Sequence, residues 1–175
     1  MIEEFWLRVA LFLIPAYAAN ASAMLFGMIL KSKTPLDLGI ILPDKQPLLG
    51  KGKTWKGTAS GIIVGTIAAG IIYALFPSET RAIAENYLIA GFLISLGAIL
   101  GDMLGSFIKR RLLIKPGSPS PILDQLDFIA GGYLLLSLVY IPLAEELVFV
   151  AVFTVITHIA TNYLAFKLGL KKVPW

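Results

Sequence analysis

The chain has 175 residues, of which 57% are hydrophobic and only 15% are charged, and its formal net charge is +4. Soluble domains average about 25% charged residues, so this composition indicates an integral membrane protein and excludes a soluble enzyme. The absence of cysteine excludes disulfides, iron–sulfur clusters and thiolate zinc sites.

Five apolar stretches predict membrane-spanning helices, because a span needs about 20 predominantly apolar residues. They cover about 5–30, 57–76, 86–108, 127–143 and 147–167. The first follows Glu3 and Glu4 and is too long for a signal peptide, so we expect it to be retained. The sequence therefore predicts an all-α, polytopic membrane protein. Residues 1–175 form one membrane domain, a bundle of five transmembrane helices.

The Lys and Arg residues are distributed unevenly along this bundle. Thirteen lie in the loops 31–56 and 109–126 and in the C-terminal tail, against only Arg8 and Arg81 elsewhere. Cytoplasmic loops of membrane proteins carry an excess of Lys and Arg, so we expect the N-terminus outside and the C-terminus in the cytoplasm. Such a basic face meets anionic lipid headgroups or nucleotides, and we expect no nucleic acid partner.

The first predicted span contains Asn20 within a patch of small residues. Two interpretations stay open for this amide: a hydrogen bond to a neighbouring helix, worth about 0.6–2 kcal/mol, or a contact with a substrate. The loop that follows (31–56) is rich in Pro and Gly but also carries apolar side chains. We therefore expect it to be ordered and docked at the membrane surface.

The segment Gly52-Lys53-Thr54-Trp55-Lys56-Gly57 leads into the second span. It is not a nucleotide-binding P-loop, because Pro47 occupies the position of the first required glycine and a membrane span follows. We expect Thr54 to cap the helix, with Lys53 and Lys56 beside its N-terminus. Exposed amides, the helix dipole and lysines together favour an anion site, although the positive-inside rule alone also accounts for these lysines.

Glycines recur at every fourth position in the second and third spans. The six positions are Gly57, Gly61, Gly65, Gly97, Gly101 and Gly105. Small faces of this kind allow helix backbones to approach closely. We expect the second and third spans to pack together and so to bring residues Lys53–Lys56 beside Asp102–Arg110.

Asp102 lies within the apolar third span, where an isolated charge costs several kcal/mol. Ser106, Lys109 and Arg110 share its helical face, which leads from the carboxylate to a cationic cluster at the membrane surface. An ion pair between Asp102 and a lysine is the structural alternative to a functional role.

Two further acids, Asp124 and Asp127, lie three residues apart at the start of the fourth span. Carboxylates suit Mg2+ that is also bound by water and phosphate oxygens, so Asp102, Asp124 and Asp127 are predicted metal ligands. Helix capping is the alternative for Asp124 or Asp127. In the fifth span, we expect His158 to be a packed, hydrogen-bonded residue rather than a ligand.

These motifs together resemble the archaeal CDP-archaeol synthases, small membrane cytidylyltransferases that are distantly related to the phosphatidate cytidylyltransferases. The resemblance covers essentially the whole chain. It is carried by Asn20, Thr34-Pro35-Leu36-Asp37-Leu38-Gly39, Gly52-Lys53-Thr54-Trp55-Lys56-Gly57, Gly101-Asp102 with Ser106 and Lys109-Arg110-Arg111, Lys115-Pro116-Gly117, and Leu123-Asp124-Gln125-Leu126-Asp127-Phe128.

The resemblance implies transfer of CMP from CTP to the lipid phosphate 2,3-bis-O-geranylgeranylglycerol 1-phosphate, with Mg2+ as cofactor, at the cytoplasmic side of the cell membrane. The implied catalytic residues are Asp102, Asp124, Asp127, Lys53 and Lys109. The implied substrate-binding residues are Asn20, Lys53, Thr54, Lys56, Ser106, Lys109 and Arg110. Protein partners are not predicted.

Two other functions fit parts of the pattern. A transporter or channel would use the charges as a structural ion-pair network, but it would place them near the bilayer midplane and not at one end. A CDP-alcohol phosphotransferase would carry a longer pattern rich in Gly and Asp within one helix, which this chain lacks.

Overall fold

The computed structural model describes residues 2–30, 34–115, 118, 120 and 122–169. It contains the helices α1 (Ile2–Ile29), α2 (Trp55–Leu75), α3 (Pro77–Thr80), α4 (Tyr87–Arg111), α5 (Leu123–Leu136) and α6 (Ala144–Lys167). Extended pairing among these residues is limited to two isolated bridges, which confirms the all-α prediction. Several residues used above lie outside the described part of the chain, namely Lys31, Lys33, Pro116, Gly117, Lys171 and Lys172.

Four of the described helices are long and apolar enough to cross a membrane: α1, α2, α4 and residues Ala144–Leu164 of α6. The predicted fourth span corresponds to α5, whose bounds differ from the expected 127–143. Its 14 residues measure about 21 Å, less than the roughly 30 Å of a hydrocarbon core. The helix gives way to turns at Ser137 because Pro142 follows shortly and its preceding residue, Ile141, is disfavoured in helical conformation.

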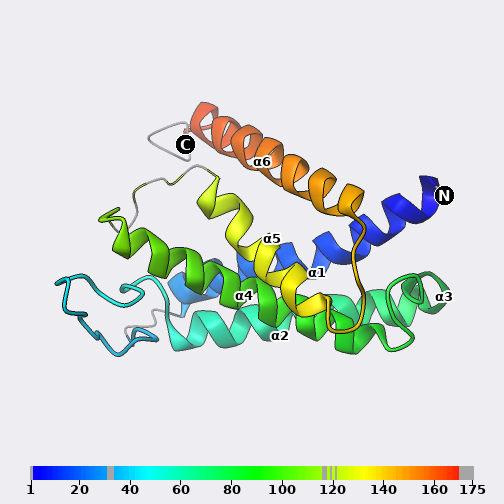
Figure 1. The fold of residues 1–175 in the computed structure, drawn as a ribbon, viewed down its shortest axis with the longest axis horizontal. Coiled ribbons are helices and arrows are strands. Elements are labelled where there is room, and N and C mark those ends of the chain that lie inside the picture. The colour runs from blue at the N-terminus through cyan, green and yellow to red at the C-terminus, as the bar shows by residue number, and fades with distance from the viewer. Residues whose placement is uncertain (1, 31–33, 116–117, 119, 121, 170–175) are drawn as a thin grey trace.

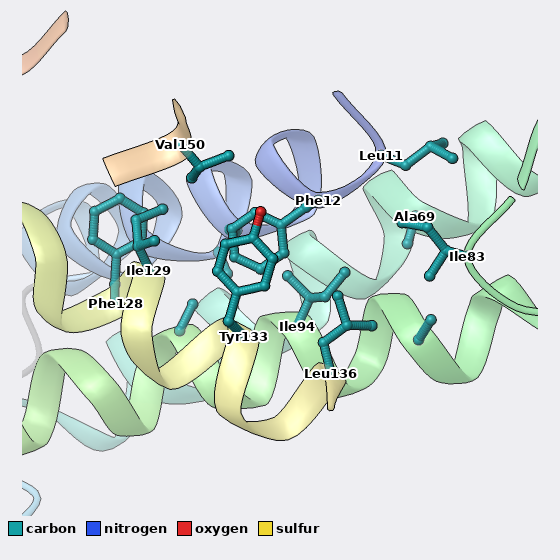
Figure 2. Packing of buried hydrophobic residues seen from close by; sticks show 14 of the residues in the cluster. Leu11, Phe12, Ala69, Ile83, Ile94, Phe128, Ile129, Tyr133, Leu136 and Val150 are labelled. Carbon is teal, nitrogen blue, oxygen red and sulfur yellow. The ribbon is translucent and has the colours of Figure 1, made fainter. Parts of the chain in front are cut away.

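Figure 1 shows α2 and α4 along one side of the molecule and α6 along the other, with α1 and α5 passing between them. The core joins α1, α4, α5 and α6 (Figure 2). At its centre the rings of Phe12 and Tyr133 stack, with centroids 3.6 Å apart, beside the fully buried Ile94 and Leu136. The hydroxyl of Tyr87 donates to the Leu11 carbonyl, so α4 is also tied to α1 by a buried hydrogen bond.

The two glycine faces have different neighbours. In α4, Gly97 and Gly101 lie against α5, where their nearest neighbours are the backbones of Gly131 and Asp127. In α2, Gly65 lies between α1 and the Ser95 side chain of α4. The prediction that the second and third spans pack together is therefore confirmed, although the α4 glycine face itself is occupied by α5. The close approach of α4 and α5 is what brings the Asp127 side chain against α4.

Polar contacts mark the two ends of the bundle. At one end, Arg8 Nε lies 2.5 Å from Glu146 Oε1, and the Tyr140 hydroxyl donates to the same carboxylate. This contact joins the beginning of α1 to the beginning of α6. At the opposite end, Lys53 before α2 meets Asp102 of α4. The helices α1 and α6 therefore run in the same direction.

Candidate active site

The beginning of α2 carries the first part of the site. Thr54 caps the helix as expected, with its hydroxyl accepting from the Gly57 N–H at 3.2 Å. The preceding residue, Lys53, reaches across to α4, and its Nζ lies 2.5 Å from Asp102 Oδ2. Both side chains are only 20–25% exposed. The expected proximity of Lys53 and Asp102 is confirmed, and Asp102 is compensated by this lysine.

The loop of residues 34–54 is ordered around Asp37. This buried carboxylate accepts from the N–H groups of Gly39, Leu49 and Gly50 at 2.8–3.0 Å. Burial acts to raise the pKa of Asp37, but these backbone hydrogen bonds outweigh it and hold the pKa below its ordinary value. Asp37 therefore fixes the loop segment that leads directly into Lys53.

Arg111, at the end of α4, anchors the far side of the same loop. Its Nη2 donates to the Pro47 carbonyl at 2.7 Å, and its Nε lies 3.1 Å from Asp44 Oδ2. The guanidinium also lies over the ring of Phe107. Among the three consecutive cations at the end of α4, Arg111 thus stabilises loop 34–54 and does not line the cavity.

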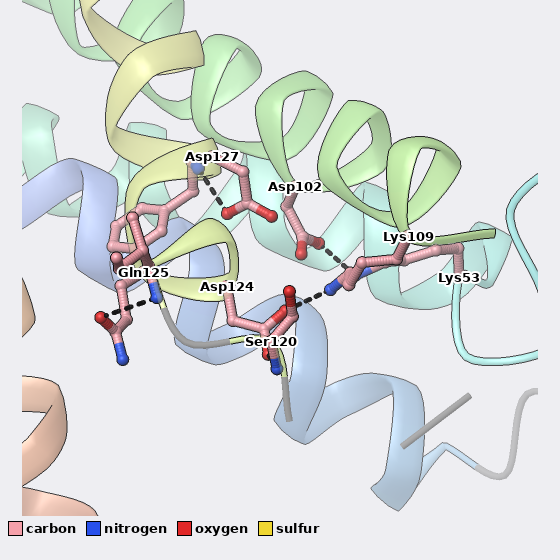
Figure 3. Close-up of polar contacts among 9 residues, drawn as sticks. Lys53, Asp102, Lys109, Ser120, Asp124, Gln125 and Asp127 are labelled. Carbon is pink, nitrogen blue, oxygen red and sulfur yellow. Dashed lines mark hydrogen bonds and ion pairs between the residues drawn. The ribbon is translucent and has the colours of Figure 1, made fainter. Parts of the chain in front are cut away.

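The three predicted metal ligands gather where α4 meets α5 (Figure 3). Lys109 pairs with Asp124 Oδ1, and Asp124 Oδ2 accepts from the Ser120 N–H at 2.9 Å. Asp127 Oδ1 accepts from the Phe128 N–H at 2.7 Å. Asp127 Oδ2 is buried against Gly105 of α4 and has no hydrogen-bond partner among the described residues. Each oxygen of Asp124 thus has a partner, whereas one oxygen of Asp127 has none among the described residues.

A cavity of about 870 Å3 opens beside these charges. The predicted site residues Asn20, Lys53, Thr54, Asp102, Lys109, Arg110 and Asp124 line it. Lys56 is instead exposed on α2, and Ser106 is buried within the helix packing. The structure therefore brings most of the predicted residues to one cavity, with Asp127 directly behind its acidic wall.

Arg110 is the cation in this wall that lacks a carboxylate partner within the described residues. The side chain is buried, with 5% of the residue exposed, and its Nε and Nη1 have no hydrogen-bond partner there. Buried donors without partners are costly and are normally satisfied by a ligand or by water. Arg110 is therefore placed to bind an anion in the cavity.

Whether the site can bind a metal ion depends on which carboxylate oxygens are free to coordinate it. Among the described residues, no group of three or more His, Asp or Glu side chains is arranged to hold one. The charges of Asp102 and Asp127 nevertheless interact, and Asp127 Oδ2 is a buried oxygen without a partner. Two carboxylates on adjacent helices fit a hard divalent cation that takes its other ligands from water and phosphate.

Apart from Asn20, the residues of the opposite wall of the cavity were not predicted from the sequence. This wall is formed by Tyr17 and Asn20 of α1 and by one face of α6, with Thr154, Thr157, His158, Thr161 and Asn162. These α6 positions follow the helical spacing i, i+3, i+4, i+7 and i+8, so the periodicity of the polar residues alone could have indicated a functional face. His158, expected to be a packing residue, lines the cavity.

A family model described as CarS-like, CDP-archaeol synthase, matches residues 1–175. The chain belongs to the CDP-archaeol synthase family. This membership confirms the resemblance seen in the sequence motifs.

Individual members of the CDP-archaeol synthase family match over nearly the whole chain. The CDP-archaeol synthase of Thermofilum pendens is 43% identical over 173 residues, covering 96% of this chain and 80% of the relative. That of Methanocaldococcus jannaschii is 41% identical and covers 94% of each chain. A solved structure described as an intramembrane enzyme for archaeal membrane lipids biosynthesis is 35% identical, with a TM-score of 0.76 over 87% of this chain and 90% of that one.

Proposed function

We propose that the protein transfers CMP from CTP to 2,3-bis-O-geranylgeranylglycerol 1-phosphate, an unsaturated archaeal ether-lipid phosphate, and releases pyrophosphate. It is a CTP-dependent cytidylyltransferase, a membrane enzyme of archaeal phospholipid biosynthesis. Full-length membership in the CDP-archaeol synthase family carries this conclusion. The cavity supports it, because cations and carboxylates meet there beside membrane helices.

The triphosphate of CTP binds at the cationic wall. Arg110 offers two unpaired nitrogens, and Lys53 and Lys109 are held at the cavity by their carboxylate partners. The N-terminus of α2, capped by Thr54, adds its dipole to the same wall. These groups stabilise the negative charge that develops on the leaving pyrophosphate, which is the main task of a phosphoryl-transfer site.

Asp102, Asp124 and Asp127 are the residues that would hold Mg2+. An ion bound there supplies charge neutralisation for the phosphates. Bringing three carboxylates together without a cation is opposed by their repulsion, which accounts for the lysine partners of Asp102 and Asp124.

The nucleophile needs no general base, because the lipid phosphate is already ionised at neutral pH. One of its oxygens attacks the α-phosphorus of CTP and forms a new P–O bond. The bond from that phosphorus to the bridging oxygen of the β-phosphate breaks, and pyrophosphate leaves with the electron pair. The chain aligns the two anions, whose mutual repulsion would otherwise keep them apart.

The site lies on the cytoplasmic side of a cell-membrane protein that crosses the bilayer five times as a single domain. The concentration of cations around loop 34–54 and the end of α4 supports this orientation. CTP then reaches the cavity from the cytoplasm, and the lipid phosphate reaches it from the inner leaflet.

The ion pairs that a transporter or channel would use do occur, between Lys53 and Asp102 and between Lys109 and Asp124. Family membership favours the enzyme. In the enzyme the same pairs hold both sets of charged groups at the cavity until substrates arrive.

The proposed reaction is tested with the purified protein in detergent, Mg2+, labelled CTP and the geranylgeranyl ether-lipid phosphate. We expect a CDP-lipid and an equal amount of pyrophosphate. Product formation stops with EDTA, and ATP does not replace CTP. Absence of product from any nucleotide, with several lipid phosphates, would overturn the proposal and favour the transporter.

A further inference from the structure

Two hydroxyl groups lie unpaired in the wall of the cavity that faces away from the charged cluster. Tyr17 Oη of α1 and Thr154 Oγ1 of α6 are both buried, and neither has a hydrogen-bond partner among the described residues. Both residues line the cavity, and Thr154 as a whole is only 1% exposed. Unsatisfied buried hydroxyls are uncommon and costly, so a ligand is expected to complete them.

Neighbouring side chains hold the two hydroxyls in place. The ring of Phe128 packs edge-on against that of Tyr17, with centroids 5.4 Å apart, and holds it in position. The Tyr17 and Thr154 hydroxyls interact with each other across the boundary between α1 and α6, but their distance and angles do not make a hydrogen bond. In contrast, Thr161, two turns further along α6, donates to carbonyls of its own helix. Tyr17 and Thr154 thus form a pair of buried hydroxyls on the wall of the cavity, without a hydrogen-bond acceptor among the described residues.

The pair lies well inside the helices that carry it, whereas two of the cavity's cations lie at a helix end. Tyr17 lies about 18 Å along α1 from its end at Ile29, and Thr154 lies about 20 Å along α6 from its end at Lys167. Lys109 and Arg110 lie in the last turn of α4. Tyr17 packs on Phe128, which directly follows Asp127, so the pair lies beside the acidic wall. An occupant that touches both the cations and the pair therefore carries an anion with uncharged acceptors a few bonds away, as a glycerol ether phosphate does.

We propose that the hydroxyls of Tyr17 and Thr154 donate hydrogen bonds to the ether oxygens of the acceptor's glycerol backbone and so set the depth of its phosphate. This inference rests on the proposed cytidylyltransferase function. Ether oxygens accept hydrogen bonds but cannot donate them, and they therefore complement donors that have no acceptor in the protein. The two residues act as specificity-determining contacts, remote from the reacting phosphates.

The test removes each hydroxyl separately, with Thr154→Val and Tyr17→Phe, so that misfolding of one variant leaves the other informative. Two acceptors are compared: the geranylgeranyl diether glycerol phosphate, and a long-chain alkyl phosphate without ether oxygens. For the diether we expect each variant to raise KM about three- to tenfold, the effect of one neutral hydrogen bond. The KM for CTP is expected to stay unchanged.

The alkyl phosphate is measured as a competitive inhibitor, so the comparison does not depend on its turnover. We expect its inhibition constant to be the same in wild type and in both variants. Thr66→Val is the matched control, because the Thr66 hydroxyl donates to Ile62 O of its own helix at 2.7 Å, away from the cavity. It should change none of these constants.

Two results would overturn the inference while leaving the reaction intact. Equal weakening of both acceptors would mean that the hydroxyls serve packing, and a raised KM for CTP would mean that they bind the nucleotide instead. Failure of the wild-type protein to form any CDP-lipid from the diether would instead contradict the proposed function itself.

Discussion

Two charged side chains, Arg110 in the cavity wall and Asp127 behind it, keep buried atoms without hydrogen-bond partners among the described residues. Their neighbours Asp102, Asp124 and Lys109 are paired with opposite charges. A folded protein does not gain stability from unpaired buried polar atoms, since each one costs about 1–3 kcal/mol. Asp127 and Arg110 are thus the residues for which catalysis gives the most direct physical explanation.

We expect Asp127→Asn to reduce turnover by at least 100-fold while the protein stays folded. The amide has the same shape and preserves the hydrogen bond from the Phe128 N–H, but it removes the charge that would bind the metal. CDP-lipid formation across a range of Mg2+ concentrations measures the effect, and thermal unfolding in detergent checks the fold.

The matched control for this substitution is Asp44→Asn. Asp44 pairs with Arg111 at the surface of loop 34–54 and is not part of the cavity wall. We expect it to retain most of the activity. Near wild-type turnover in Asp127→Asn would remove Asp127 from the site, and the same result in Asp102→Asn as well would exclude the proposed metal ligands.

At the scale of elements, the contact between α4 and α5 determines where the acids lie. Gly101 of α4 lies against the Asp127 backbone, and Gly131 of α5 lies against the backbones of Gly97 and Gly101. A Cβ on Gly131 would meet main-chain atoms, which cannot rotate away. The position of Asp124 and Asp127 therefore depends on this backbone-to-backbone packing.

Gly131→Ala is expected to destabilise the protein by about 1–3 kcal/mol, the usual effect of overpacking, and to lower turnover because α5 shifts away from α4. Gly70→Ala is the control. A Cβ there meets only the Leu88 side chain at an ordinary 3.5 Å, and alanine favours the helix, so stability should be equal or higher. Unfolding temperature and turnover of both variants are measured together, and an unaffected Gly131→Ala would show that α5 tolerates displacement.

The second element that positions the site is loop 34–54, which depends on the ionised form of Asp37. Because the pKa of Asp37 is lowered in the folded protein, its contribution to stability is complete above the pKa of about 3.9 of an unfolded aspartate. The contribution is lost as the pH falls below that value through the lower pKa of the folded state. Loop order should therefore weaken below about pH 4.

Limited proteolysis of the detergent-solubilised protein measures this loop directly. We expect cleavage within residues 38–51 to increase as the pH falls below about 4 in the wild type, with an acid-active protease. In Asp37→Ala the cleavage should be fast at every pH. A wild-type loop that is equally protected at pH 3 and pH 6 would contradict the role given to the Asp37 carboxylate.

For the whole molecule, the sequence predicted the helical class and the approach of Lys53 to Asp102, and most of the predicted site residues line the cavity. Charge in an apolar span is costly enough to stand out in a single sequence, which is why Asp102 led to the site. The partner of each glycine face could not be predicted, because a small face fits any helix with a complementary surface. The place of Thr154 in the cavity wall was missed because the polar residues of α6 were considered singly and not as one face.

The course of the chain through the bundle supports five membrane crossings, although α5 by itself is too short to span the hydrocarbon core. The ion pair between Arg8 and Glu146 brings the beginnings of α1 and α6 to the same end, and Asp124 at the start of α5 lies at the other end beside Lys109. Residues 124–144 therefore travel the length of the bundle, with turns and an extended stretch completing the path after Leu136. An odd number of crossings places the two termini on opposite sides.

The cysteine-free sequence allows this topology to be tested with single-cysteine variants and a membrane-impermeant maleimide on intact cells. Ser78→Cys in the short helix α3 and Ile141→Cys between α5 and α6 are both exposed and should be labelled from outside. Lys51→Cys and Leu112→Cys should be labelled only after permeabilisation, because they lie on the basic face. Labelling of Ile141→Cys only after permeabilisation would mean that α5 turns back without crossing. The site would then be formed by four crossings and a re-entrant helix, which is possible only where such a helix is buried in protein.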